Sequence, residues 1–269
     1  MAGHASGRWT SWRLVLCALL LSASVQAGDF GFSEWLLAPV RVHLWTSVDG
    51  DDLHTTLSEA DVERIVGKVN KVWAQAGLAF YVESVVREAP VQRNRLDGNP
   101  GSVDRSAEGL PEPSPMRYVD RAHWSGAVFN VYYLKRFKPN GLYAGGTVFV
   151  KDTASLRPVE GGIEEPLPRV TSHELGHALG LVHRQDTFNL MASGTTGTLL
   201  NGDEISAARA RAVELGRFVG ADALLDEAQR LAGEGKVGAA RERYARLVEL
   251  PMDSAKLSRL REWLQQHPR

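Results

Sequence analysis

Cysteine is almost absent from this sequence: Cys17 is the only one among 269 residues. It lies inside an apolar run and follows the bulky Leu16, whereas a lipoprotein signal has a small residue before its cysteine, so a lipid anchor is disfavoured. No cysteine follows residue 17. The rest of the chain therefore has no disulfide to stabilise it and no thiolate to offer to zinc.

A long hydrophobic run is also missing. The apolar stretch Leu14–Leu21 falls well short of the roughly 20 residues that a membrane-spanning helix needs. Arg8 and Arg13 precede it and the small-residue sequence Val25-Gln26-Ala27 follows it, which is the arrangement of a secretory signal peptide. We predict that residues 1–27 are removed, that no stable membrane span remains, and that the protein is exported to a periplasm or secreted. A short membrane anchor is the alternative.

Neither sign of charge is in excess, with Lys+Arg 31 against Asp+Glu 32. Removal of residues 1–27 takes away two arginines and no acids, which changes the formal net charge from −1 to −3. This balance, with 43% hydrophobic residues, is ordinary for a soluble globular protein. It gives no indication of a nucleic acid or an anionic membrane surface as the partner.

The first ordered segments follow a strand, helix, strand pattern. Residues 40–45 alternate apolar and polar side chains, as a half-buried strand does. A helix capped by Ser58 and Asp61 comes next and is expected to end at Gly77, and residues 78–86 return as a second strand. This order predicts a parallel pair of strands joined by a helical crossover.

The later segments are more varied. Residues 88–115 are rich in Pro, Gly, Ser, Asn and charges, which predicts a long surface loop, either a substrate-contacting flap or an inert insertion. Strands are predicted at residues 128–134 and 145–150, the second with glycines at its start. Beyond Asn201 the pattern is helical throughout. Residues 221–269 are predicted to be a C-terminal helical extension: a cap packed on the domain, or one hairpin resembling a tetratricopeptide unit.

One segment carries a pattern typical of metal chemistry: His173-Glu174-Leu175-Gly176-His177-Ala178-Leu179-Gly180-Leu181-Val182-His183. On a helix, His173 and His177 lie one turn apart on the same face and can bind one ion. Glu174 can act as a base toward water on that ion. Gly180 can adopt the left-handed conformation that ends a helix, which lets His183 turn back to the same ion. Three imidazoles with an open fourth position are typical of catalytic zinc.

This eleven-residue motif resembles the zinc signature of the metzincin peptidases. The sequence Asn189-Leu190-Met191-Ala192-Ser193 resembles the methionine-containing turn of that clan, which lies beneath the zinc. For residues 28–220 the resemblance implies an α+β, metzincin-like catalytic domain: a twisted mixed sheet, an active-site helix and the Met-turn, followed by helices. It implies one catalytic Zn²⁺, Glu174 as the general base, and Gly180 and Met191 as structural residues near the site.

The resemblance also implies where a substrate binds. In metzincins an edge strand of the sheet pairs with extended substrate, and the segment from Gly145 to Val150 would be this strand. Gly146, Thr147, Val148 and Phe149 are then the predicted substrate-binding residues. The segment from Ser193 to Asn201 would border the pocket for the side chain that follows the scissile bond.

Two positions depart from familiar subfamilies. Astacin and serralysin relatives have a tyrosine where this chain has Ser193, and Arg184 after the third histidine matches none of the best-known subfamilies. The Leu-Gly-Leu-Val-His run is most similar to matrixins, but the cysteine of a matrixin propeptide is missing, so the subfamily stays open.

The expected function is that of an exported zinc-dependent endopeptidase, with Glu174 moving a proton from water to the leaving amine of a peptide or protein substrate. One alternative is a zinc-binding peptide-recognition module without general proteolytic activity, with a protein partner at the C-terminal helices. The intact Glu174 argues against it. Another is a peptidase dedicated to one protein substrate.

Other polar residues give weaker signals. The acids that precede the motif have a spacing that matches no calcium loop, so calcium is unsupported: Asp152, Glu160, Glu164 and Glu165. Isolated histidines are more often surface or packed residues than ligands, and this is the expectation for His43, His54 and His123.

Overall fold

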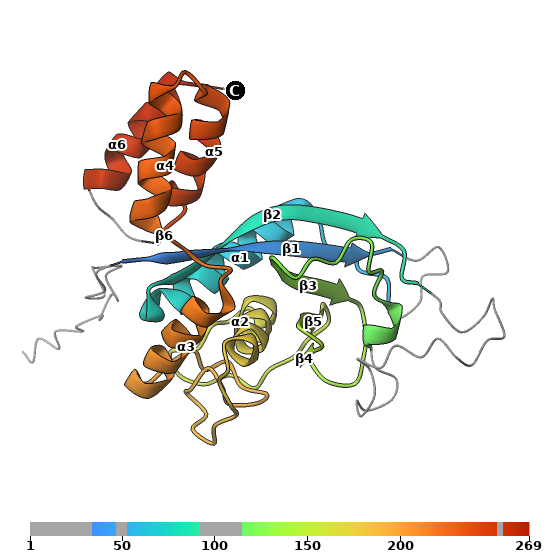
Figure 1. The fold of residues 1–269 in the computed structure, drawn as a ribbon. Helices are drawn as coiled ribbons and strands as arrows, with labels where there is room; N and C mark the ends of the chain where they lie inside the picture. The colour runs from blue at the N-terminus through green and yellow to red at the C-terminus, as the bar shows by residue number, and fades with distance from the viewer. Residues whose placement is uncertain (1–33, 47–52, 92–114, 252–254, 269) are drawn as a thin grey trace, which may run out of the picture.

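The computed structural model describes residues 34–46, 53–91, 115–251 and 255–268. The predicted signal peptide and residues 92–114 of the predicted long loop lie outside these residues. Helices cover a mixed sheet with the strand order β2-β1-β3-β5-β4, and a short strand, β6 (Val219–Gly220), pairs with β1 (Figure 1). The fold is therefore mixed α/β, which is compatible with the expected α+β class.

The predicted parallel pair of strands is confirmed. Strand β1 (Leu36–Trp45) pairs in parallel with β2 (Leu78–Glu88), and helix α1 (Glu59–Trp73) connects them. Ser58 and Asp61 cap α1 reciprocally, each side chain accepting from the other residue's backbone N–H. The α-helix ends earlier than expected, because residues 74–76 form the 3₁₀ helix η1 before Gly77 closes the turn at φ 62°.

The other half of the sheet contains one strand that was not predicted. Strands β3 (Phe129–Leu134) and β5 (Thr147–Lys151) pair in parallel. Strand β4 (Gly141–Ala144) then pairs antiparallel with β5 and forms one edge of the sheet. Gly145 and Gly146, at φ 54° and 75°, make the turn between β4 and β5, so they close a hairpin and do not open a strand.

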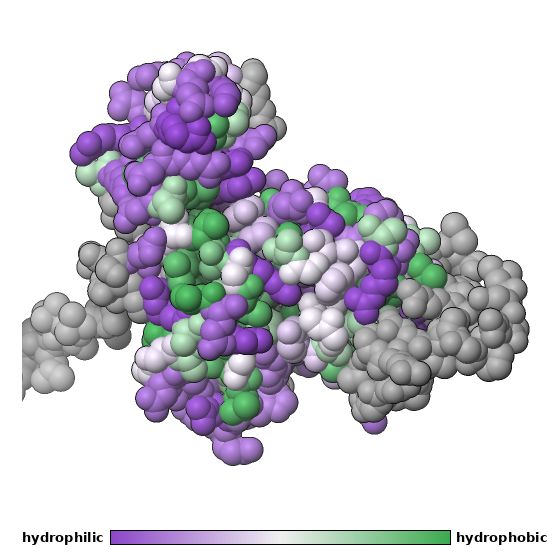
Figure 2. All heavy atoms as spheres, in the orientation of Figure 1, coloured by the Kyte–Doolittle hydropathy of each residue, from purple (hydrophilic) through white to green (hydrophobic). Residues whose placement is uncertain are grey.

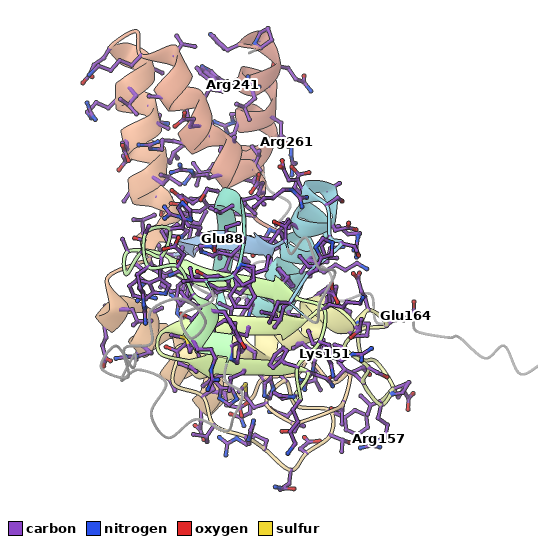
Figure 3. All side chains as sticks on the ribbon, turned by 90° about the vertical axis from the view of Figure 1, so that its right-hand side faces the viewer. Glu88, Lys151, Arg157, Glu164, Arg241 and Arg261 are labelled. Carbon is purple, nitrogen blue, oxygen red and sulfur yellow. The ribbon has the colours of Figure 1, made fainter. Side chains whose placement is uncertain are left out.

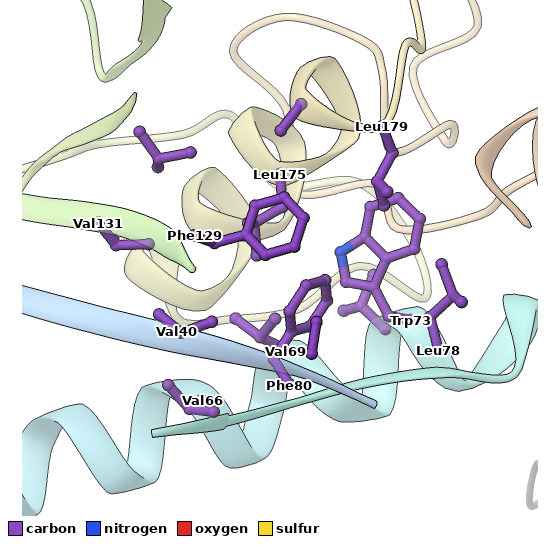
Figure 4. Close-up of a cluster of buried hydrophobic side chains, with 14 of the residues drawn as sticks. Val40, Val66, Val69, Trp73, Leu78, Phe80, Phe129, Val131, Leu175 and Leu179 are labelled. Carbon is purple, nitrogen blue, oxygen red and sulfur yellow. The ribbon is translucent and has the colours of Figure 1, made fainter. Parts of the chain in front are cut away.

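The main core lies between the sheet and two helices. Alternate residues of β1 face α1 and α2 (Pro166–Ala178), as the period of two in a strand requires. Large side chains from α1, β2, β3 and α2 meet at the centre of this cluster, as Figure 4 shows: Trp73, Phe80, Phe129 and Leu175. This packing fixes α2 against the sheet.

The other alternate residues of β1 belong to two smaller clusters on the opposite face. Trp45 packs with the segment that contains the 3₁₀ helix η3 (Pro115–Tyr118). Trp35 and Leu37 pack against the C-terminal helices. Arg41, between them, is partly exposed and hydrogen-bonds to Glu83, Ser84 and the carbonyl of His123. The segment that contains η3 and the C-terminal helices therefore cover different parts of this face of the sheet.

The C-terminal extension is a unit of three helices: α4 (Ala221–Gly233), α5 (Val237–Val248) and α6 (Ala255–Gln266), which we call the helical unit. It stands on the outer side of β1 and β2 in Figure 1. Its base shares a core with Trp35, Leu37 and Ala79, and the Arg246 guanidinium lies 4.3 Å from the centre of the Tyr81 ring. The contacts fit the interpretation as a packed cap.

The surface of the helical unit in Figure 2 is mostly hydrophilic. Within the described part of the chain, no helix combines the length and apolar character required to cross a bilayer.

Candidate metal centre

Helix α2 presents His173 and His177 on one face, and both imidazoles are oriented by backbone carbonyls. His173 Nδ1 lies 2.8 Å from the carbonyl oxygen of Leu190, and His177 Nδ1 lies 2.9 Å from that of Leu181. A carbonyl can only accept, so each Nδ1 carries the proton and donates. Each Nε2 therefore keeps its lone pair, which is the arrangement of a metal-binding histidine with an outer hydrogen bond.

The chain turns at Gly180 as the sequence predicts. Gly180 has φ 81°, its N–H donates to the carbonyl of His177, and the N–H of Leu181 donates to the carbonyl of Gly176. These two bonds form a Schellman motif, which ends the helix. The chain beyond the turn then reverses toward α2 and carries His183 back to its face.

The turn brings the three histidines together. His177 Nε2 and His183 Nε2 are 3.1 Å apart, and one nitrogen from each ring lies within 4.8 Å of the others. Two nitrogens bound tetrahedrally to zinc at normal bond lengths are roughly 3.3 Å apart. The residues present therefore fit a zinc ion with three imidazole ligands.

Burial shifts the pKa values of the side chains at this site. Desolvation lowers the pKa of His173 to about 3 and also lowers that of His177. Neutral imidazole is the form that binds a metal. Desolvation raises the pKa of Glu174 to about 8, against the opposing effects of Arg169 and the backbone N–H of Tyr143. A cation placed beside Glu174 would favour its charged form.

Met191, which the resemblance to metzincins places beneath the histidines, packs against α2 at Gly176. Its side chain is fully buried, and a Cβ built on Gly176 would lie 2.6 Å from its sulfur. Gly176 stands between His173 and His177 on α2, so the methionine can approach the helix only because residue 176 has no side chain. The backbone N–H of Met191 donates to Asn189 Oδ1 at 2.6 Å.

A polar network behind the site was not predicted. Glu204, in the first turn of α3 (Gly202–Leu215), accepts from Arg184 Nε at 2.7 Å and from Asn189 Nδ2 at 2.8 Å. Burial raises the pKa of Glu204, but hydrogen bonds from Asn201, Asn189 and Arg184 outweigh it and lower the pKa overall. The Asn201-x-x-Glu204 spacing is a capping pattern that could have located the start of α3. No pattern indicated its contacts with the turn that contains Met191.

A pocket of about 200 Å³ opens beside the histidines. Its lining comes from the start of β4, the loop after β5, α2, the third histidine and the chain after Met191: Pro139, Asn140, Gly141, Leu156, Arg169, Val170, His173, Glu174, His183, Ser193 and Gly194. Ser193 and Gly194 belong to the segment expected to border a substrate pocket. Arg169 was not singled out from the sequence, because a lone arginine in a helix carries no distinctive pattern.

The prediction that the segment from Gly145 to Val150 is an edge strand is wrong. Thr147, Val148 and Phe149 lie on β5, which pairs with β3 on one side and β4 on the other, and their side chains are buried. Gly146 lies in the preceding turn. The backbone N–H and C=O groups of these β5 residues therefore pair with the neighbouring strands β3 and β4. The strand at the sheet edge next to α2 is β4, where a Cβ on Gly141 would lie 2.4 Å from Glu174 Oε1.

The other histidines lie away from this centre. His43 is fully buried, stacks on Tyr132 and lies 2.8 Å from Glu88 Oε1 through Nδ1. His123 contacts the second oxygen of Glu88. Glu88, Asp120 and His123 form the other group of potential metal ligands among the described residues. His54, just before α1, has the intermediate burial expected of a packed or surface residue.

The acids near α2 do not gather. Glu165 pairs with Arg64 and Lys68 on α1, and Asp152 accepts from Thr55 at 2.7 Å. Within the described segments, neither belongs to a group of ligand-type side chains, and the same holds for Glu160 and Glu164. A calcium site remains unsupported.

Comparison with known proteins gives no family. No family model matches the chain, and no curated protein matches it. A solved structure described as "Structure of a chaperone-substrate complex" aligns with a TM-score of 0.39 and 12% sequence identity, over 67% of this chain and 34% of that one. The aligned part is thus about a third of that protein's chain. A similarity of this size identifies neither fold family nor function.

Proposed function

We propose that this protein is an exported zinc-dependent endopeptidase of the metzincin type. The observation that carries the proposal is the convergence of His173, His177 and His183 beside Glu174. Three nitrogens lie within 4.8 Å, and two of the rings have their Nδ1 protons engaged by backbone carbonyls. A bare polar helix face would not require the turn at Gly180 or a methionine packed against Gly176.

The donor set favours zinc over calcium or magnesium, which prefer oxygen ligands. A zinc ion bound there supplies a Lewis acid that polarises a carbonyl and acidifies water. Glu174 is 5% exposed and next to the ligands, so its carboxylate can take a proton from water and give it to the leaving amine. The backbone N–H of Tyr143 and the guanidinium of Arg169 favour the charged carboxylate that this role needs.

The free edge of β4 supports binding of an extended peptide. Among the described residues, β4 is paired on one side only, with β5, and it runs beside α2 at the level of Glu174. Unpaired N–H and C=O groups on a sheet edge can hydrogen-bond to the backbone of another chain. A peptide added there passes over the three histidines. This replaces β5 as the proposed substrate-binding strand.

The test is zinc content and peptide cleavage of the purified protein, compared with Glu174→Gln. We expect close to one zinc per chain in both proteins and cleavage of a mixed peptide library by the wild type alone. Absence of zinc would overturn the proposal. Zinc binding with no cleavage of peptides or of candidate protein substrates would favour the peptide-recognition module, with a partner at the helical unit.

A further inference from the structure

Arg169 is a buried cation that lines the pocket beside the histidines. It is 2% exposed and lies on α2 four residues before His173, hence on the same helix face, about 6 Å along the axis. Its Nε donates to the carbonyl of Gly197 at 3.1 Å, and Nη2 donates to the carbonyls of Asn189 and Ala192. Two of its three nitrogens therefore hold the chain that follows the histidine motif.

The third nitrogen, Nη1, is not held by these carbonyls. Among the described residues, Nη1 has no hydrogen-bond partner. It does not belong to the fully buried side-chain atoms without a partner, so part of its surface is accessible. The space that Arg169 lines is this pocket. The carbonyls thus fix the guanidinium through Nε and Nη2, and Nη1 is the nitrogen left for a group that enters the pocket.

The charge of Arg169 is not neutralised by an ion pair within the described residues. Burial lowers its pKa to about 10, with Glu174 opposing that effect, so the side chain is charged at neutral pH. Glu174 is the acid among the pocket-lining residues, and it lies against Gly141 on the β4 side. Carbonyl oxygens satisfy the N–H groups but leave the net charge, which Glu174 offsets only from beyond ion-pair distance, and a buried charge without a close counter-ion is costly.

We propose that this pocket receives an acidic side chain, Asp or Glu, from the substrate residue that follows the scissile bond, with its carboxylate bound by Arg169 Nη1. The proposal rests on the proposed peptidase function and names its substrate class. The separation of about one helical turn between Arg169 and His173 matches the reach of a Glu side chain from a peptide lying across the histidines. A carboxylate and a guanidinium form a charge-assisted hydrogen bond, stronger than that of a neutral amide.

The experiment uses two short peptide hydroxamates that differ only in Glu or Gln at the residue entering the pocket, with the zinc-loaded protein. Binding of the pair needs the metal and the pocket but no turnover. We expect the Glu compound to bind at least about tenfold more tightly. The corresponding peptide substrates should show the same order in kcat/KM.

Three variants assign the preference to Arg169. Arg169→Met should remove the Glu preference, and Arg169→Lys, which keeps a charge without the planar fork, should retain part of it. Arg157→Met is the matched control. Arg157 is exposed among the loops at the end of the molecule away from the helical unit (Figure 3), and its backbone bonds to Gly194 of the pocket. It should leave the ratio unchanged.

Each outcome decides the proposal. Equal binding of the two hydroxamates by zinc-loaded wild type overturns it and leaves the peptidase proposal intact, as does a Glu preference that persists in Arg169→Met. If Arg169→Met does not fold, the wild-type ratio and Arg169→Lys still decide. Failure of the wild type to bind zinc overturns both proposals.

Discussion

Arg184 Nε and Glu204 Oε1 are 2.7 Å apart, and this ion pair ties the residue after the third histidine to the first turn of α3. The other oxygen of Glu204 binds Asn189, which in turn accepts from the backbone N–H of Met191. The backbone N–H of Arg184 donates to the carbonyl of Met191 at 3.0 Å. The segment after the third histidine and the turn that contains Met191 are therefore held together by a carboxylate that is 2% exposed.

Replacing Glu204 by Ala should destabilise the protein and weaken zinc binding. The change leaves Asn189 Nδ2 without an acceptor in a buried position and removes the partner of Arg184, so the free energy of unfolding should fall by about 3 kcal/mol. Denaturant unfolding of the metal-free protein and a chelator competition measure the two effects. Glu214→Ala, which breaks an exposed pair with Arg211 on the same helix, should change stability by less than about 0.5 kcal/mol. Equal losses of stability in Glu204→Ala and Glu214→Ala would mean that the hydrogen bonds of Glu204 do not stabilise the fold.

Gly176→Ala should lower stability and zinc affinity, although alanine favours helices. The new Cβ would lie 2.6 Å from the sulfur of Met191, which is fully buried and cannot move away freely. We expect a loss of about 1–2 kcal/mol from this overpacking. Gly67→Ala is the matched control, since Gly67 lies within α1 and its Cβ would meet nothing within 4 Å. It should gain about 0.5–1 kcal/mol. Thermal unfolding of both variants gives the comparison, and the same sign for both would contradict the packing argument.

The stability of the metal-free protein should depend on pH in two opposed ways. His173 has a folded pKa of about 3 against 6.5 unfolded, so the unfolded state binds the extra proton and stability is lost as pH falls below 6.5. Glu174 has a folded pKa of about 8 against 4.5 unfolded, so its contribution is present below 4.5 and is lost as pH rises to 8. The two effects oppose each other between 4.5 and 6.5.

Glu174→Gln separates these effects. Without the carboxyl group, the free energy of unfolding should fall by at least about 1.4 kcal/mol per pH unit below 6.5, because the lowered pKa of His177 adds to the effect of His173, whereas the wild type should show a shallower slope. Urea unfolding of both metal-free proteins at pH 7.5, 6 and 5 measures this. Parallel slopes would show that Glu174 is ionised in the folded metal-free protein.

Removing the helical unit should destabilise the rest of the chain. Truncation after Gly220 would expose Trp35, Leu37 and Ala79, which share a core with α4–α6. We expect a lower unfolding midpoint and a tendency to aggregate, because a contiguous apolar patch would face water. Arg246→Ala is a milder change that removes the stacking on Tyr81 and should cost no more than about 1 kcal/mol. An undiminished midpoint after truncation would show that the unit is a separate attachment.

The sequence alone determined the local geometry of the candidate site. The spacing of His173 and His177, the turn at Gly180 and the cap at Ser58 each depend on a few consecutive residues, and helical periodicity or a left-handed glycine is enough to predict them. The parallel pairing of β1 and β2 followed from an equally local rule, a helical crossover between two strands.

Tertiary structure decided which strand is the edge of the sheet and which side chains surround the histidines. β4 is four residues long and weakly patterned, so Gly145 and Gly146 looked like the start of a strand instead of the turn of a hairpin. Arg169 meets the carbonyls of Asn189, Ala192 and Gly197 at least 20 residues away. Such pairings depend on how distant segments pack, and sequence periodicity reports only which residues share a face, not what that face meets.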